Sequence, residues 1–147
     1  MRTIMKKEAV YTIREMQADD YEAVYALWSK TPGMGLSDAD SYANIVRFLQ
    51  KNKGLCFVCL DQGQIIGTAL CGHDGRRGYL YHVTVAETYR SRGIGTALVE
   101  SCLRRLKAEG IDKCHLFVFA DNEPGMSFWR TLGWEKRDDV VVYSRNI

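Results

Sequence analysis

Hydrophobic side chains recur along the chain with two different periods. In the first third they return every three or four residues, which predicts an amphipathic helix from Ala18 to Ser29 and a second from Asp38 to Lys51. Ser37 stands where an N-cap is expected. The segment 31–36 contains Thr-Pro-Gly-Met-Gly and breaks the pattern between the two helices.

Further along, short apolar runs bounded by turn residues predict strands. They are Val10–Arg14, Leu55–Asp61, Gln64–Gly72, Tyr79–Val85, Lys113–Ala120, Trp134–Arg137 and Val140–Ser144. Two more amphipathic segments predict helices at Gly93–Glu109 and Glu123–Leu132. The order is β-α-α-β-β-β-α-β-α-β-β, which predicts one α/β domain with a mixed sheet over residues 1–147. Residues 1–8 are interpreted as a short leader that could be disordered.

Composition excludes several classes of partner. The 147 residues include 20 basic and 18 acidic side chains, a net charge of +2, which argues against nucleic acid as a partner. No apolar run has the length of a membrane span, so we expect no membrane contact. The basic N-terminal residues are not followed by an apolar stretch, so a secretory signal is not predicted and we expect a cytoplasmic protein.

The five cysteines are Cys56, Cys59, Cys71, Cys102 and Cys114. An odd number without a secretion signal is typical of free thiols in a reducing compartment. Cys56 and Cys59 have CxxC spacing, but on a strand residues three apart point to opposite faces. We therefore predict core cysteines and no metal.

A glycine-rich turn joins the predicted strand Tyr79–Val85 to the helix that follows. Glycines at a helix start expose backbone N–H groups, and the helix dipole adds positive potential, so this turn predicts a pyrophosphate cradle. Its residues are Arg90, Ser91, Arg92, Gly93, Ile94, Gly95 and Thr96. The alternative is a tight turn that requires small residues. A Walker loop is excluded because no Gly-Lys-Ser/Thr follows, and a dinucleotide-binding fingerprint fits poorly.

Two motifs in this order resemble the GNAT superfamily of N-acetyltransferases. One is Val83-Thr84-Val85 followed by Arg90-x-x-Gly93-x-Gly95, and the other runs from Asn122 through Trp129 to Gly133-Trp134. The resemblance implies a sheet whose fourth and fifth strands splay apart. It also implies transfer of an acetyl group from acetyl-CoA to a primary amine of a small molecule or peptide.

The resemblance assigns coenzyme contacts residue by residue. Backbone amides of Val83 to Val85, Thr84 included, would pair with the pantetheine arm, and those of Val83 and Val85 would polarise the thioester carbonyl. Asn122 would bond the pantetheine, while its alternative role is a helix cap. Trp129 would line the coenzyme tunnel, or else pack in the core.

The sequence also departs from the family pattern. Trp129 stands where the family has a tyrosine thought to protonate the leaving thiolate, and an indole does not give up its proton at neutral pH. Tyr143 or a water could substitute. The two positions at which members carry a glutamate base hold Tyr79 and Phe117. These departures keep open an alternative, a non-catalytic acyl-CoA-binding sensor on the same fold.

His82, in the central strand, is the leading candidate for the general base. Imidazole titrates near neutrality, and strand alternation with Val83 directs His82 to the acceptor side. Its alternative is a structural, hydrogen-bonded histidine.

The acceptor side is expected to include both N-terminal helices, their glycine-containing link and the turn before the central strand. The candidate residues are Trp28, Met34, Asp74, Arg76, Tyr79 and Tyr81. Asp74 could border the same cleft as His82. Arg76 could bind an acidic acceptor, and its alternative is a solvated turn. The predicted edge strand Val140–Ser144 could mediate a homodimer.

Overall fold

The computed structural model describes residues 2–6 and 9–147. They form two compact units, one ending at Phe117 and one spanning Val118–Ile147. Of the predicted leader, residues 2–6 form strand β1 (Arg2–Lys6), which pairs antiparallel with β2 (Ala9–Glu15). Met1, Lys7 and Glu8 lie outside the described residues.

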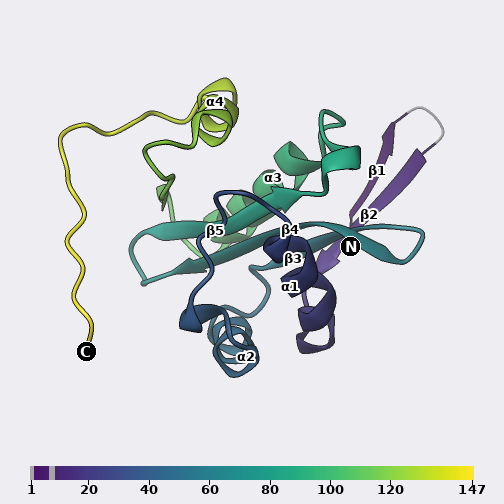
Figure 1. Cartoon of the computed structure of the whole chain (residues 1–147), viewed down its shortest axis with the longest axis horizontal. Coiled ribbons are helices and arrows are strands. Elements are labelled where there is room, and N and C mark those ends of the chain that lie inside the picture. The colour runs from purple at the N-terminus through teal and green to yellow at the C-terminus, as the bar shows by residue number, and fades with distance from the viewer. Residues whose placement is uncertain (1, 7–8) are drawn as a thin grey trace. The chain divides into compact units, whose positions relative to one another are not determined.

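The first unit is built on a mixed sheet. In the described residues its six strands follow the order β1-β2-β3-β4-β5-β6, and all neighbours are antiparallel except β5 and β6 (Figure 1). The bounds of the remaining strands are β3 Phe57–Asp61, β4 Gln64–His73, β5 Gly78–Val85 and β6 Cys114–Leu116. The α/β class and the mixed sheet predicted from the sequence are confirmed.

Helices cover both faces of this sheet. In the first unit the helices are η1 Ala18–Asp20, α1 Tyr21–Ser29, η2 Asp38–Asp40, α2 Tyr42–Lys51, η3 Glu87–Tyr89 and α3 Ile94–Ala108. The second unit contains α4 Glu123–Thr131. Figure 1 shows α1 and α2 on one face of the sheet and α3 on the other. The η segments are single 3-10 turns. Each of the two predicted N-terminal helices opens with such a turn.

The two faces bury different cores. On the α1 side, Trp28 and Val24 are fully buried with Cys56 and Leu70. On the α3 side, the helix approaches β4 so closely that a Cβ at Gly67 would lie 3.0 Å from the Leu98 side chain. Glycine therefore allows helix and strand to pack at this distance.

Strands β5 and β6 separate after a short pairing. The register joins Gly78–Leu80 to Cys114–Leu116, and β5 then continues alone to Val85. The predicted strand Lys113–Ala120 is therefore shorter than expected. The predicted splay is confirmed, since residues 81–85 face no β6 partner in the part of the chain that the structure describes.

A β-bulge interrupts β5 at its centre. Tyr81 pairs with Leu70 and Thr84 pairs with Thr68, so two β5 residues, His82 and Val83, oppose one on β4. His82 has a left-handed backbone with φ of 50°. Because the bulge inserts one residue, the alternation of side chains between the two faces reverses across it.

The last two predicted strands, Trp134–Arg137 and Val140–Ser144, are wrong. Neither segment has strand structure, and Val141 and Tyr143 are 78% and 92% exposed. Valine-rich segments fit a strand, but a strand also needs a neighbouring chain for its N–H and C=O groups. Within the described residues of the second unit these segments pair with no other strand, so the edge strand considered for a homodimer is not formed.

The five cysteines are free thiols, and four of them are buried. The structure places no group of three or more His, Cys, Asp or Glu in metal-binding geometry among the described residues. In the same residues, no helix combines the length and apolar character that crossing a bilayer requires.

Candidate functional site

The glycine-rich turn precedes helix α3, and Gly93 is the N-cap of that helix. Ser91 and Gly93 both have left-handed backbones, with φ of 63° and 82°. A Cβ added at Gly93 would meet nothing within 4 Å. The first intrahelical bond runs from the Ala97 N–H to the Gly93 carbonyl, so the amides of residues 94–96 have no acceptor within the helix. A left-handed turn that ends in free helix amides can bind an anion.

Aromatic and acidic side chains hold the arginines of this turn. The Arg92 guanidinium donates to the Tyr11 hydroxyl at 2.7 Å and lies 5.3 Å from the centre of the Tyr89 ring. The Tyr89 hydroxyl donates in turn to Asp61 at 2.7 Å, and this bond raises the pKa of Tyr89. Arg90 donates to the backbone carbonyl at the end of β5 at 3.0 Å. The arginines therefore brace the turn that precedes the free helix amides.

The turn continues directly from the free part of β5. Residues 81–85 lack β6 partners, and η3 connects them to α3 without a break in the chain. The unpaired strand edge and the helix amides form one continuous stretch of backbone. This arrangement suits an elongated ligand that has hydrogen-bonding groups along its length and an anionic end.

His82 is held from three directions beside this edge. Its Nε2 lies 2.7 Å from Asp40 Oδ1, and its ring packs 4.7 Å from the Trp28 ring. Its backbone carbonyl accepts from the Thr68 hydroxyl at 2.8 Å. These contacts with α1 and η2 place His82 on the face that the sequence analysis assigned to the acceptor. The side chain remains 14% exposed.

Trp28 supports His82 from within the core. It is fully buried, and its indole N–H donates to the Thr68 hydroxyl at 2.9 Å. Met34 is half-buried against the same cluster. Both residues were expected on the acceptor side. The structure buries Trp28 in the core against His82, and an acceptor role for Met34 stays a prediction.

An aromatic row, formed by Tyr79, Tyr81 and Phe117, follows β5 and β6 where they begin to separate. Ring centres lie 6.4 Å apart for Tyr79 and Tyr81 and 6.3 Å apart for Tyr79 and Phe117, with planes within about 20° of parallel. Phe48 of α2 packs edge-on against Tyr81, so the row shares the face of His82. Phe117 is 62% exposed, whereas partial burial raises the pKa of Tyr81. The row presents a flat, uncharged surface.

The turn before β5 makes a different set of contacts. Asp74 Oδ1 accepts from the backbone N–H groups of Arg76 and Arg77, each at 2.8 Å, which lowers the pKa of Asp74. His73 pairs with Glu109 at the end of α3 at 2.9 Å. Because this turn is tied to α3, and His82 contacts α1 and η2 on the opposite face, the structure does not bring Asp74 to His82. An acceptor role for Asp74 and Arg76 stays a prediction.

In the second unit, Asn122 is the N-cap of α4. Its side-chain oxygen accepts from the Gly125 N–H at 3.1 Å, as the capping alternative proposed. Trp129 packs against Phe128 and Trp134, with ring centres 4.9 and 5.1 Å away. The coenzyme roles of Asn122 and Trp129 stay predictions.

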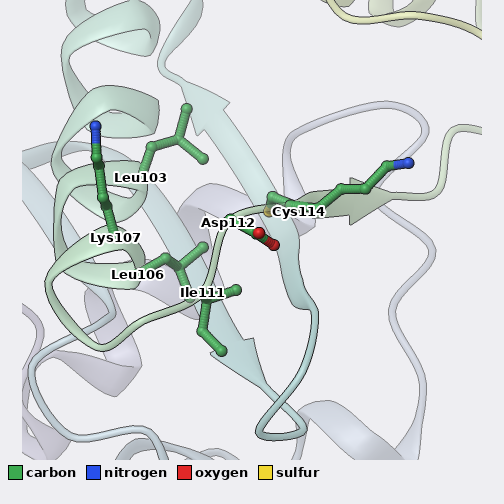
Figure 2. Close-up of a pocket in the computed structure, with 7 residues that line it drawn as sticks. Leu103, Leu106, Lys107, Ile111, Asp112 and Cys114 are labelled. Atoms are coloured by element: carbon green, nitrogen blue, oxygen red, sulfur yellow. The ribbon is translucent and has the colours of Figure 1, made fainter.

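A cavity of about 350 Å³ lies between the end of α3 and β6 (Figure 2). It is lined by Leu103, Leu106, Lys107, Ile111, Asp112, Lys113 and Cys114. None of these is a predicted coenzyme or acceptor residue. The glycine turn lies at the opposite end of α3, and 15 residues of helix span about 22 Å. The cavity is therefore separate from the glycine turn.

Sequence reasoning missed Asp40, Thr68 and Tyr11, which hold the site's functional groups in place. Asp40 had a detectable signal, since Ser37-x-x-Asp40 has the spacing of a capping box, and the structure forms that box. The partnership of Asp40 with His82, 42 residues away, has no local signature.

Comparison with known proteins agrees with this architecture. Residues 15–134 match the model of the acetyltransferase (GNAT) family. An acetyltransferase of Pectobacterium atrosepticum is 33% identical over 92% of this chain and 95% of its own length, and one of Sodalis glossinidius is 32% identical over 92% and 94%.

Solved structures share the fold at lower identity. An aminoglycoside N-acetyltransferase in complex with CoA superposes with a TM-score of 0.78 at 20% identity, over 98% of this chain and 100% of that one. The PaiA N-acetyltransferase of Thermoplasma acidophilum, in complex with coenzyme A, gives 0.76 at 19%, over 87% and 91%. The chain belongs to the GNAT acetyltransferase family, and it is an acetyltransferase.

Proposed function

We propose that this protein transfers the acetyl group of acetyl-CoA to a primary amine, by direct attack of the amine on the thioester. The observation that carries this proposal is the position of His82. A carboxylate-bound imidazole stands on the bulge of β5, at the start of the edge that β6 leaves free. A proton acceptor and unpaired backbone donors therefore belong to the same few residues.

The glycine turn supports binding of the coenzyme. The left-handed Ser91 and Gly93 and the free amides of residues 94–96 would hold the pyrophosphate, and the edge of β5 would pair with the pantetheine arm. The coenzyme contacts of Asn122 and Trp129 that the family resemblance implies are part of the same proposal. The open space at Gly93 leaves room for phosphate oxygens close to the backbone.

In the proposed reaction, the nitrogen lone pair of the acceptor attacks the thioester carbon while His82 takes a proton from the amine. The amides of Val83 and Val85 stabilise the negative charge that develops on the carbonyl oxygen. The new C–N bond forms, the C–S bond breaks, and the electron pair of that bond leaves with the coenzyme sulfur. A thiolate is a tolerable leaving group, because a free thiol has a pKa of about 8.5. A tyrosine at the Trp129 position is therefore not essential.

The acceptor is proposed to be a small-molecule amine whose apolar part lies on the aromatic row. Several solved structures of this fold are aminoglycoside acetyltransferases, one of them in complex with sisomicin. The row in this chain carries no carboxylate. Its flat rings favour an amine with a planar or apolar body over a polycation.

The proposal is tested by replacing His82. We expect His82→Ala to lower turnover more than about tenfold, because general base catalysis is lost, while affinity for acetyl-CoA stays within about threefold. Calorimetric titration with acetyl-CoA, desulfo-CoA and ATP measures binding, and a screen of amines measures transfer. His73→Ala is the matched control, since His73 is hydrogen-bonded to a carboxylate in the turn tied to α3.

The outcomes separate the parts of the proposal. Equal turnover of His82→Ala and wild type would remove the base assignment. Tight and selective coenzyme binding without transfer to any amine would favour the acyl-CoA sensor that the sequence left open.

A further inference from the structure

We propose that Asp40 is a positioning residue for His82, which fixes the hydrogen of the imidazole on Nε2 and leaves Nδ1 to take the proton of the acceptor amine. This inference rests on the proposed function, in which His82 is the base. It assigns a role to a residue from a segment that precedes β5 by about forty positions.

The two carboxylate oxygens of Asp40 have separate partners. Oδ1 lies 2.7 Å from His82 Nε2, and Oδ2 accepts from the Ser37 N–H at 3.0 Å. A carboxylate only accepts hydrogen bonds, so the ring nitrogen facing it carries the hydrogen. In a neutral imidazole the other nitrogen then holds the lone pair. Asp40 therefore decides which atom of His82 is basic.

Asp40 is itself fixed rigidly. The residue is 6% exposed, and its backbone carbonyl accepts from the Tyr21 hydroxyl at 2.6 Å. The capping box with Ser37 closes the η2 turn around it. A buried carboxylate is costly unless it is paired, and the imidazole completes its set of partners. The pair thus joins the η2 turn to the sheet.

The histidine is fixed from the other side. Its left-handed backbone lies in a region that non-glycine residues rarely adopt, and the Thr68 hydroxyl binds its carbonyl. Of the other groups that contact His82 and Asp40, the Trp28 ring, the Thr68 hydroxyl and the Ser37 N–H do not titrate. The Tyr21 hydroxyl is bound to the backbone carbonyl of Asp40. Asp40 is the charged partner of the ring among the described residues.

Asp20 provides a matched comparison, because it occupies the same position in η1 that Asp40 occupies in η2. It closes the η1 turn by accepting from the Gln17 N–H at 2.8 Å, and its partner is Arg14, at 2.8 Å from each oxygen. Burial raises the pKa of Asp20, but the bonds from Arg14 and Gln17 outweigh it and the pKa is lowered. Asp20 and Asp40 therefore share the capping role, but only Asp40 contacts the proposed base.

The proposal is tested by determining which ring nitrogen of His82 carries the hydrogen. The 15N chemical shifts of the ring report this, measured by NMR at a pH at which imidazole is neutral. His82→Gln assigns its signals among those of the three histidines. We expect the Nε2–H form in the wild type, a mixture of tautomers in Asp40→Ala, and the wild-type form in Asp40→Asn, because the amide oxygen can still accept. Asp20→Ala should leave the signals of His82 unchanged.

Turnover supplies the second readout. Asp40→Ala should lower the rate of acetyl transfer more than about tenfold at unchanged affinity for acetyl-CoA, with Asp40→Asn between it and the wild type and Asp20→Ala near the wild type. The proposal is overturned if Asp40→Ala keeps the wild-type tautomer, or if Asp20→Ala lowers turnover as much. If Asp40→Ala does not fold, Asp40→Asn decides, and a changed tautomer there contradicts the proposal.

The tautomer is measured without coenzyme or amine. A wild type that shows the Nε2–H form but acetylates no amine would therefore contradict the proposed function and leave the pairing of Asp40 with His82 intact.

Discussion

The glycine turn and the surroundings of His82 are built in opposite ways. The turn, from Arg90 to Thr96, is one continuous stretch of chain whose proposed binding groups are backbone amides. The surroundings of His82 are side chains from α1, η2 and β4, which meet on a bulge of β5. The first region can be recognised from a short motif, and the second exists only after the sheet and helices have packed.

This difference has a chemical consequence. A pyrophosphate is the same in every acyl-CoA, so backbone amides can bind it with little dependence on side chains. An acceptor and its proton require particular atoms at particular positions, which side chains from distant elements supply. We therefore expect substitutions in the two regions to separate coenzyme binding from turnover.

The largest effect is expected at the glycine turn. Gly93→Glu should abolish binding of acetyl-CoA, because a carboxylate would stand among the amides proposed to hold the pyrophosphate, and the left-handed φ of 82° would be strained. Calorimetric titration measures the loss.

Gly75→Glu is the control for strain alone. Gly75 also has a left-handed backbone, with φ of 92°, and open space around it, but it lies in the turn before β5. If both variants bind acetyl-CoA equally well, the glycine turn does not hold the coenzyme.

A smaller effect is expected on the free energy of unfolding at alkaline pH, through a buried thiol in the core behind His82. Burial raises the pKa of Cys56 to about 12, whereas the pKa of a thiol in the unfolded chain is about 8.5. The native state therefore keeps the proton that the unfolded state loses, so stability is full below about pH 8.5 and falls as pH rises toward 12. Cys56 belongs to the cluster around Trp28.

Chemical denaturation at a series of pH values measures this loss. The free energy of unfolding of the wild type should fall about 1.4 kcal/mol per pH unit more steeply than that of Cys56→Ala. If the unfolding free energies of the two proteins fall equally steeply with pH, the Cys56 thiol is not buried in solution.

The smallest effect concerns the bond that joins Trp28 to the sheet. Trp28→Phe removes the donor to Thr68, and Thr68→Val removes the acceptor together with the bond to the His82 carbonyl. Each should cost about 1–3 kcal/mol of stability, because a buried polar group loses its partner. The double variant should cost less than the sum of the two because the two residues share a bond. Additive losses would mean that this bond does not couple α1 to β4.

The helices and the central strands could be predicted because each has a local signature. The period of apolar residues defines α1, α2 and α3, and turn residues bound β3 to β5. The strands expected at Trp134–Arg137 and Val140–Ser144 share that signature but find no strand partner in the described chain. Strand propensity is satisfied only by a neighbour, which a local pattern does not specify.

In the candidate site, too, the features with a local signature could be predicted, and those that depend on distant contacts could not. The turn at Gly93 and the choice of His82 came from residue type and position. The bracing of Arg92 by Tyr11, and the pairing of His82 with Asp40, depend on contacts 81 and 42 residues apart. Trp28, expected at an open acceptor surface, is instead fully buried.

The sequence by itself determined the family, the order of elements from β2 to α4 and the backbone turn at the start of α3, because each of these is encoded by neighbouring residues. Only the tertiary structure decided where side chains of β5 point. The bulge at His82 inserts one residue between Tyr81 and Thr84, so the alternation of faces along β5 reverses at that position. A bulge is set by how two strands pair across the sheet, and its effect on a side chain appears only when both strands are in place.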